Sequence, residues 1–463
     1  MPQAETPLLD MLHAAEGRVR LHMPGHKGRL PEAWLRAALD TTEIARTDDL
    51  FSPSDGIARA QALYAAVCGA RSTIFLTGGS TAGVLAMLLY AAAPGGEVIL
   101  PRNAHHSAMS ACVWGDLSPV FVQPRLTPDG APYLTAQDVL RTMDAHPRAK
   151  AVLLTRPDYY GICAQMAPVA ARCHERGVLL CVDEAHGAHL PWQGEPQSAG
   201  ALGADLWVQS AHKTLPALTG AAVLHAGAGV DAGAGVDAAR LLRTVRMVHT
   251  SSPSFLAMGT LDGARALMDE RGTELLERLH ARIGAFWDRA RAAGYANAHD
   301  AWEALGLACD PARIVVDCTP RGLTGWRAQE LLDGLGIDAE MADDRRVVFI
   351  PSVMDEADWL ERAALALASL PACGEAHAPV CAPPPLPMRA MRVREAALAP
   401  QENVPLSQAA GRVAAVSAGL YPPGVPLVTP GEEIPQEVVE TMLRAAPRWR
   451  FGLQDDQIPC VRE

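Results

Sequence analysis

A lysine and an aspartate in this chain occur in surroundings unlike those of ordinary surface residues. Lys213 stands in the motif Gln209-Ser210-Ala211-His212-Lys213-Thr214, 30 residues after Asp183. A single lysine is most often a solvated surface residue, and a single aspartate often caps a helix. Here Asp183 ends the apolar run 177–182, and Lys213 follows the strand-like run 204–208. Ligands in open α/β sheets bind beyond the carboxyl ends of such strands, so both residues fall where a site is expected.

A lysine and a buried acid in this arrangement fit the chemistry of pyridoxal 5'-phosphate (PLP). The lysine amine forms a Schiff base with the cofactor, and the carboxylate keeps the pyridine nitrogen protonated. The turn Thr77-Gly78-Gly79-Ser80-Thr81 lies between a predicted strand and a predicted helix. Backbone N–H groups and hydroxyls at such a place bind phosphate. A plain Ser/Thr N-cap after a glycine turn is the alternative interpretation.

Histidines near these motifs are further candidates. His105 and His106 follow the next predicted strand, where one imidazole could stack on a pyridine ring. We expect no metal site there, because adjacent residues tend to point apart and no carboxylate partner is evident. His186, in the motif of the aspartate, could reach the reacting centre. Ser210 and His212 flank the lysine and could hold the phosphate or a substrate carboxylate.

The composition is that of a globular enzyme with two or three domains. The chain has 463 residues, and its net charge of −12 argues against nucleic acid or an anionic membrane as a partner. No two of the ten cysteines form a C-x-x-C pair, which argues against a zinc ribbon and favours a reducing compartment. Residues 1–10 lack the regions of a signal peptide, and the longest apolar stretch, 84–93, is too short to span a bilayer. We therefore expect a cytoplasmic protein.

Alternating strand and helix patterns must position these residues. They extend from about residue 61 to 250 and predict a doubly wound, mainly parallel sheet. The expected strands are 72–76, 97–100, 120–122, 151–155, 178–182, 206–209 and 221–224, with helices at 57–68 and 82–92. The segment GAGVDA at 227–232 repeats at 233–238 and is interpreted as a lengthened surface loop, because it lacks the G-x-G-x-x-G spacing.

The pattern changes after residue 313. Strands at 313–318 and 346–350, with helices at 325–335 and 356–370, predict a small α+β domain. A proline-rich linker at 378–387 separates a third segment from it.

The order of the motifs resembles a known family. TGGST, PRNAHHS, RPDYYG, VDEAHGAH, QSAHK and SSPSFLAMGTLD occur as in the Orn/Lys/Arg decarboxylases of PLP fold type I. Within that family the chain is similar to the shorter bacterial enzymes that lack the long N-terminal wing domain. MPGHKG near residue 25 and the YPPGVP and PGE segments near residue 425 fit as well, so the resemblance covers nearly the whole chain.

The resemblance implies an α/β fold like that of aspartate aminotransferase. An N-terminal segment, 1–60, would lie at the active site and dimer interface. Residues 61–300 would form the PLP-binding large domain with its mainly parallel sheet. A small α+β domain at 301–375 and a C-terminal α+β decarboxylase domain at 388–463 would follow.

By matching positions, the resemblance also assigns roles to residues. Lys213 would form the Schiff base, Asp183 would bind the pyridine nitrogen, and His105 would stack on the ring. His186 would approach the reacting substrate. The third domain contributes near the substrate side chain, which makes Glu432 a candidate for binding the distal cation. The remaining cofactor-binding residues would be Ser80, Thr81, Ala185, Ser210 and His212.

The chain departs from the family pattern at three places. It has Gly78-Gly79-Ser80 where the family often has Asn-Gly-Thr or Gln-Gly-Thr, and His105-His106-Ser107 where it often has His-Lys-Ser. It has Arg156-Pro157-Asp158-Tyr159 where the family often has Asn-Pro-Thr-Tyr. The strand end that carries Arg156 faces the cofactor in this fold, so Arg156 and Asp158 could alter the choice of substrate.

The expected reaction is PLP-dependent decarboxylation of a basic amino acid to the amine and CO2, as in polyamine biosynthesis. Arginine is the first choice of substrate, followed by lysine or ornithine. The proton that replaces CO2 on Cα would come from Lys213 or His186. The active form would be a homodimer or a higher homo-oligomer. Two alternatives stay open: another PLP reaction, such as transamination or a lyase reaction, and a non-catalytic regulatory paralogue, against which the intact Lys213 and Asp183 argue.

Overall fold

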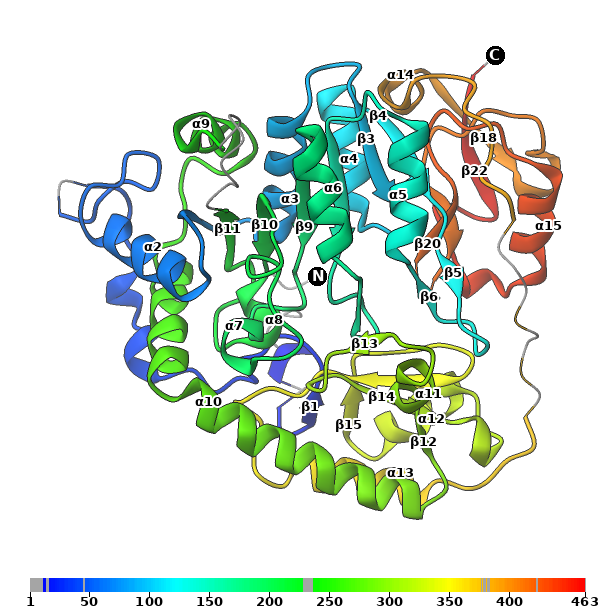
Figure 1. Ribbon diagram of the computed structural model, residues 1–463. Helices are drawn as coiled ribbons and strands as arrows, with labels where there is room; N and C mark the ends of the chain where they lie inside the picture. Colours follow the sequence, from blue (N-terminus) through cyan, green and yellow to red (C-terminus); the bar gives the residue numbers. More distant parts are fainter. Residues whose placement is uncertain are drawn as a thin grey trace, which may run out of the picture.

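A large α/β domain forms the centre of the molecule, with smaller units below it and beside it (Figure 1). The computed structural model describes residues 11–13, 16–44, 46–227, 236–375, 377, 380, 384–421 and 424–462. Most of the GAGVDA duplication lies outside the described residues, so its interpretation as a surface loop stays a prediction.

A seven-stranded sheet forms the core of the large domain. Neighbouring strands pair in parallel except at β11, which is antiparallel to both of its neighbours. This arrangement confirms the predicted mainly parallel sheet. The strand order is β2 (Ser72–Leu76), β11 (Ala222–Ala226), β10 (Leu206–Gln209), β9 (Leu179–Asp183), β7 (Ala151–Thr155), β3 (Glu97–Pro101) and β4 (Ser118–Val122).

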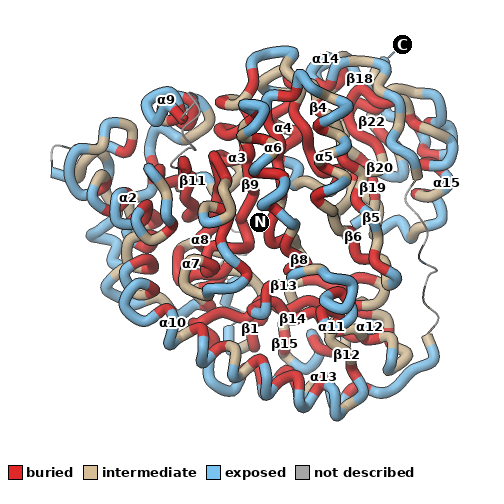
Figure 2. Tube along the Cα trace, in the orientation of Figure 1, coloured by how far each residue is buried: buried red, intermediate tan, exposed pale blue. Residues whose placement is uncertain are grey.

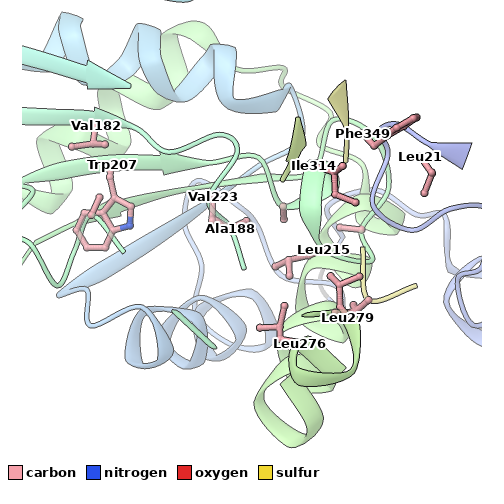
Figure 3. Packing of buried hydrophobic residues seen from close by; sticks show 14 of the residues in the cluster. Leu21, Val182, Ala188, Trp207, Leu215, Val223, Leu276, Leu279, Ile314 and Phe349 are labelled. Atoms are coloured by element: carbon pink, nitrogen blue, oxygen red, sulfur yellow. The ribbon is translucent and has the colours of Figure 1, made fainter. Parts of the chain in front are cut away.

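Both faces of this sheet are buried, as a parallel sheet requires. Successive residues of a strand enter different hydrophobic clusters: Val182 and Trp207 pack on one face, while Cys181 packs on the other. Figure 3 shows the first of these clusters, and Figure 2 shows the buried residues concentrated along the strands. The alternation follows from the two-residue period of a strand and explains why the strands are apolar throughout.

Two helices of the large domain differ from the predicted pattern. Helix α3 (Gly79–Ala91) begins three residues before the predicted start, so the hydroxyl residues of the Gly-Gly-Ser-Thr turn belong to its first turn. Helix α10 (Phe255–Ala292) was not predicted; its 38 residues lead from the large domain to the small one. Glycine at position 83 lets α3 pack closely on the sheet, because a Cβ there would lie 2.4 Å from Val208 Cγ2.

The small domain is built on a four-stranded antiparallel sheet. Its strand order is β12 (Ala296–Asn297), β14 (Ile314–Asp317), β17 (Arg346–Phe349) and β16 (Met341–Ala342). Helices α12 (Gly325–Gly334) and α13 (Trp359–Ser369) accompany it. The N-terminal segment joins this domain, because β1 (Val19–Leu21) pairs in parallel with β15 (Ile337–Ala339).

The C-terminal part has a hydrophobic cluster of its own, which includes Val438, Met442 and Ile458. Strand β18 (Gln401–Pro405) pairs with β22 (Gln457–Val461). A second sheet contains β20 (Val425–Val428), β19 (Ala418–Leu420) and β21 (Arg450–Phe451), and helix α15 (Gln436–Arg444) packs beside them. None of the helices in the described part of the chain combines the length and apolar character that a membrane span needs.

A buried ion pair attaches the C-terminal part to the large domain. Arg102 donates hydrogen bonds to both carboxylate oxygens of Glu432 over 2.7 Å each, and also to the carbonyls of Pro426 and Leu427. Glu432 is only 1% exposed. Both oxygens of Glu432, the residue predicted to bind the distal cation of the substrate, are thus paired with an arginine of the same chain.

We predict that Glu432→Ala destabilises the protein. The change leaves the buried Arg102 guanidinium without its partner, and breaking a buried pair in this way costs about 3–5 kcal/mol. Denaturant unfolding of the two variants Glu432→Ala and Glu433→Ala provides the measurement. Glu433 is partly exposed, so its substitution should cost much less. Equal losses for the two variants would contradict the anchoring role of Glu432.

Candidate active site

One cavity of about 490 Å³ lies beyond the carboxyl ends of the central strands. Residues from the N-terminal segment, the large domain and the C-terminal part line it, from Met23 to Phe451. Seven of the predicted site residues line it: Ser80, His105, Asp158, Asp183, Ala185, His186 and Lys213. Five others do not: Thr81, Arg156, Ser210, His212 and Glu432.

The sheet places Asp183 and Lys213 in the same cavity. Asp183 is the last residue of β9 and lies opposite Val208 of the adjacent parallel strand β10. Helix α8 (Ala211–Thr214) begins two residues after β10 and carries Lys213. Burial raises the pKa of the Asp183 carboxyl, and the nearby Lys213 charge acts in the opposite direction. Burial lowers the pKa of Lys213, while Asp183 opposes that shift.

His186 lies between Lys213 and Arg313, a residue that was not predicted to belong to the site. Its Nε2 lies 3.1 Å from Lys213 Nζ, and its Nδ1 lies 3.0 Å from Nη2 of Arg313 in the small domain. The ring of Tyr159 packs edge-on against the His186 ring, with 5.1 Å between their centroids. Burial, followed by the charges of Lys213 and Arg313, holds the pKa of His186 well below its usual value.

The first turn of α3 lies beside the lysine and could hold an anion. Its leading N–H groups have no partner within the helix, and Ser80 lines the cavity. Ser80 Oγ lies 2.7 Å from Ser210 Oγ, which brings the two hydroxyls together although only Ser80 lines the cavity. The His212 ring is held by a 3.0 Å hydrogen bond from Nδ1 to the carbonyl of Ala221. Thr81, in the same turn, lies outside the cavity lining.

His105 lies where a neutral aromatic ring could stack on a cofactor. It lines the cavity as the N-cap of helix α4 (His106–Gly115), and its Nδ1 is 2.8 Å from Ser107 Oγ. Burial, with the charges of His106 and Lys213, lowers the pKa of His105 to about 4. The imidazole is therefore neutral near pH 7. Among the described residues, no group of three His, Cys, Asp or Glu side chains could hold a metal ion.

The two residues that were expected to influence substrate choice point in different directions. Arg156 does not line the cavity and donates hydrogen bonds to the carbonyls of Ala164 and Gln197. Asp158 does line the cavity, and its Oδ1 accepts hydrogen bonds from the backbone N–H groups of Tyr160 and Ile162. Burial raises the pKa of Asp158 to about 7, against the effect of these hydrogen bonds.

Several residues in or directly behind the cavity wall were not predicted as site residues. The Tyr159 hydroxyl donates to Glu340 Oε1, and the backbone N–H of Met23 donates to Glu340 Oε2 over 2.9 Å. Tyr421, Gly424 and Phe451 of the C-terminal part line the cavity as well. Of these residues, Tyr159 belongs to the RPDYYG motif, whereas Glu340 and Phe451 belong to no motif that could have revealed them.

The donor set of the cavity fits PLP. Lys213 offers an amine, Asp183 a buried carboxylate, and the start of α3 offers N–H groups and a hydroxyl for a phosphate, all in one cavity. The buried hydroxyl of Thr155, which also lines the cavity, has no hydrogen-bond partner within the described structure. With one antiparallel strand in a parallel sheet and a small domain that contributes to the site, these features define a PLP-dependent enzyme of fold type I.

The chain belongs to the Orn/Lys/Arg decarboxylase family and is a decarboxylase. Residues 6–306 match the family model for the major domain of Orn/Lys/Arg decarboxylases, and residues 382–450 match the model for their C-terminal domain. An arginine decarboxylase of Halalkalibacterium halodurans is 32% identical over 93% of this chain and 91% of its own length. One of Bacillus subtilis is 31% identical over 96% of this chain and 94% of its own length.

Solved structures support the same fold. Lysine decarboxylase A from Pseudomonas aeruginosa matches 91% of this chain and 74% of its own length, with a TM-score of 0.76 at 18% identity. An alanine–glyoxylate aminotransferase from Nostoc sp. matches 80% of this chain and 96% of its own length, with a TM-score of 0.57 at 17% identity. Membership of the Orn/Lys/Arg decarboxylase family implies PLP as the cofactor.

We predict that PLP attaches to Lys213 alone. The chain has only two other lysines, Lys27 and Lys150, and neither lines the cavity. Borohydride reduction of the PLP-loaded protein, followed by peptide mass spectrometry, should find the added mass on Lys213. Lys213→Ala should abolish the label and the visible absorbance of the cofactor, whereas Lys150→Ala should change neither. A label on Lys27, the other buried lysine, would contradict the assignment.

Proposed function

We propose that the enzyme removes the α-carboxylate of a basic amino acid, releasing CO2 and the corresponding amine, with arginine as the preferred substrate. Lysine and ornithine are the next candidates. The arginine decarboxylases that are 31–32% identical over nearly the whole chain support this order. The family assignment favours this reaction over transamination and over a non-catalytic paralogue.

One observation supports a cationic substrate. Asp158 and Asp183 are the carboxylate-bearing residues among the described residues that line the cavity. Asp183 is committed to the pyridine nitrogen, so Asp158 remains for a guanidinium or ammonium group. Its Oδ1 is held by two backbone N–H groups, which fixes the carboxylate in place. Charge-assisted hydrogen bonds of this kind are among the strong ones, and a guanidinium can bind a carboxylate through two of them.

Aromatic residues at the cavity wall would accompany the rest of the substrate. Tyr159, Tyr421 and Phe451 all line the cavity. Their faces can pack on an aliphatic side chain and attract a cation. A long basic side chain therefore has both apolar and acidic surroundings available to it.

The remaining site residues would position the reacting groups. Bound PLP supplies an electron sink that stabilises the charge left on Cα when CO2 departs. Asp183 would keep the pyridine nitrogen protonated, and the neutral ring of His105 would pack against the cofactor. The first turn of α3, with Ser80 and Thr81, would hold the phosphate. Ser210 would support this turn through its contact with Ser80, His212 would support the lysine helix, and Ala185 would border the cofactor.

We further propose that the active form is a cytoplasmic homodimer. Apolar side chains at Leu35, Leu39 and Ile44 are exposed in the N-terminal segment, and Met247 is 70% exposed in helix α9 (Ala238–Val248). The two regions meet through Phe51, whose ring packs against His249. Exposed apolar surface of this kind is typical of an interface between subunits. The nine cysteines in the described residues are all free thiols, which fits a reducing compartment.

Release of CO2 tests the proposed reaction. The purified, PLP-loaded protein should release CO2 from arginine faster than from lysine or ornithine, with the matching amine as the second product. A keto acid in place of CO2 would identify an aminotransferase instead. Absence of CO2 with all three substrates, despite a Lys213-dependent cofactor absorbance, would refute the proposed substrate class.

We predict that Asp158→Asn raises KM for the basic substrate. Loss of a charge-assisted hydrogen bond costs about 1.5–3 kcal/mol, which corresponds to roughly 10-fold to 150-fold. Asp158 must be ionised to hold a cation, and its pKa is about 7, so kcat/KM of the wild-type enzyme should fall as the pH drops below 7. This fall in kcat/KM at acidic pH should be smaller in Asp158→Asn.

The matched variant is Glu340→Gln, since Glu340 contacts Tyr159 but does not line the cavity. It should change KM less than Asp158→Asn does. The reverse order of effects would identify Glu340 rather than Asp158 as the group that binds the distal cation.

A further inference from the structure

Arg313 contacts His186, and His186 in turn contacts Lys213 in the candidate active site. Arg313 precedes strand β14 of the small domain, and its side chain is buried, with 2% of the residue exposed. Its Nη2 lies 3.0 Å from Nδ1 of His186, and Nε2 of the same ring lies 3.1 Å from Nζ of Lys213. The contacts therefore connect a small-domain arginine to the reacting amine through one imidazole ring.

The chemistry of these groups fixes where the protons are. A guanidinium carries five N–H donors and no acceptor, so His186 Nδ1 must accept the hydrogen bond from Arg313. A neutral imidazole has a single N–H, which then has to lie on Nε2. The partner of that N–H is Lys213 Nζ, and only an uncharged amine has a lone pair with which to accept it.

We propose that Arg313 is a positioning residue that, through His186, holds the Lys213 amine in its unprotonated form. The proposal rests on the assignment of Lys213 as the cofactor-binding lysine and does not depend on which basic amino acid is the substrate. Arg313 acts through His186 and need not touch cofactor or substrate.

The charges around the lysine agree with this proton arrangement. Burial lowers the pKa of Lys213; Asp183 and Glu340 oppose the shift, and Arg313 adds to it. His105 and His212 also lie near the His186 ring, and their charges would lower its pKa further. None of these neighbours offers His186 Nδ1 an acceptor in place of the guanidinium within the described structure.

The surroundings of Arg313 direct it towards the histidine. Its Nε and Nη1 are buried and have no hydrogen-bond partner in the described part of the chain, although Asp310 and Glu340 influence its charge from nearby. The backbone of Arg313 is fixed by a 3.0 Å hydrogen bond from its N–H to the carbonyl of Asp310. Gly161 leaves room for the side chain, because a Cβ there would lie 2.9 Å from Arg313 Cβ.

This arrangement has two consequences for the reaction. An amine attacks a carbonyl carbon only through its lone pair, so Lys213 is ready to bind the cofactor. His186 cannot accept a second proton while Arg313 donates to Nδ1, so it cannot become an imidazolium acid.

Competitive labelling of the cofactor-free protein tests the proposal without measuring activity. Trace acetic anhydride modifies only unprotonated amines, and peptide mass spectrometry reports each of the three lysines separately. Lys150 is exposed and serves as the reference, whereas Lys27 is buried and reports on folding. In the wild-type protein the half-labelling pH of Lys213 should lie clearly below that of Lys150.

Substitution of Arg313 should change that value. The Gln side chain of Arg313→Gln can accept as well as donate, which frees His186 to carry its proton on Nδ1. The half-labelling pH of Lys213 should then rise by about one unit, within the range that a nearby charge or hydrogen bond produces. Arg313→Lys retains an obligatory donor and should remain close to the wild type.

A double-mutant cycle separates positioning from the charge of Arg313 alone. In a His186→Phe background, Arg313→Gln should have little further effect if Arg313 acts through the imidazole. A full-sized effect in that background would mean that Arg313 acts on Lys213 directly and would overturn the proposal. An unchanged half-labelling pH in Arg313→Gln, with Lys27 still protected, would overturn it as well.

A second measurement needs no Arg313 variant and so does not depend on whether one folds. Nitrogen-15 NMR of histidine-labelled wild-type protein distinguishes the two neutral tautomers, and His186 is the signal that disappears in His186→Phe. The proposal requires a proton on Nε2 and none on Nδ1. A proton on Nδ1 would overturn it even if the enzyme proves to be an active decarboxylase.

Discussion

The register of two adjacent parallel strands is the constraint on which the site depends. Because β9 and β10 run in the same direction, Asp183 and the helix that carries Lys213 emerge at the same edge of the sheet. Both groups are thereby withdrawn from water, and burial shifts both pKa values towards the uncharged forms. The shared position at the sheet edge thus favours the unprotonated form of Lys213, which the proposed role of Schiff-base lysine requires.

Much of the sheet and part of the cavity could be predicted from the sequence. The seven strands were recognisable as apolar runs, and their carboxyl ends identified Lys213, Asp183, His105 and Asp158 as cavity residues. Side-chain direction and pairing across the chain could not be predicted in this way. Arg156 follows a strand yet does not line the cavity, Glu432 pairs with Arg102 across 330 residues, and Arg313 reaches His186 across 127. Local sequence patterns predict which residues lie at the end of a strand. The long-range partners depend instead on how distant parts of the chain pack together.

The N-terminal segment holds the parts of the cavity together. Gly25 donates its N–H to the carbonyl of His212 over 2.7 Å, beside the lysine helix, and its own carbonyl accepts from Ser352 of the small-domain side. Lys27 donates to the carbonyls of His22 and Ile350, and burial lowers its pKa to about 8. The MPGHKG motif therefore connects the candidate site to the small domain.

The wall formed by Tyr421, Gly424 and Phe451 belongs to a part of the chain with its own hydrophobic cluster, fastened to the large domain by Glu432 and Arg102. Arg102 directly precedes the loop of His105, so the attachment point lies next to the cofactor groups without including them. Mutations can therefore change the C-terminal wall of the cavity and its large-domain residues independently. Substitutions at Tyr421 or Phe451 can reshape one wall of the cavity without altering His105, Asp183 or Lys213.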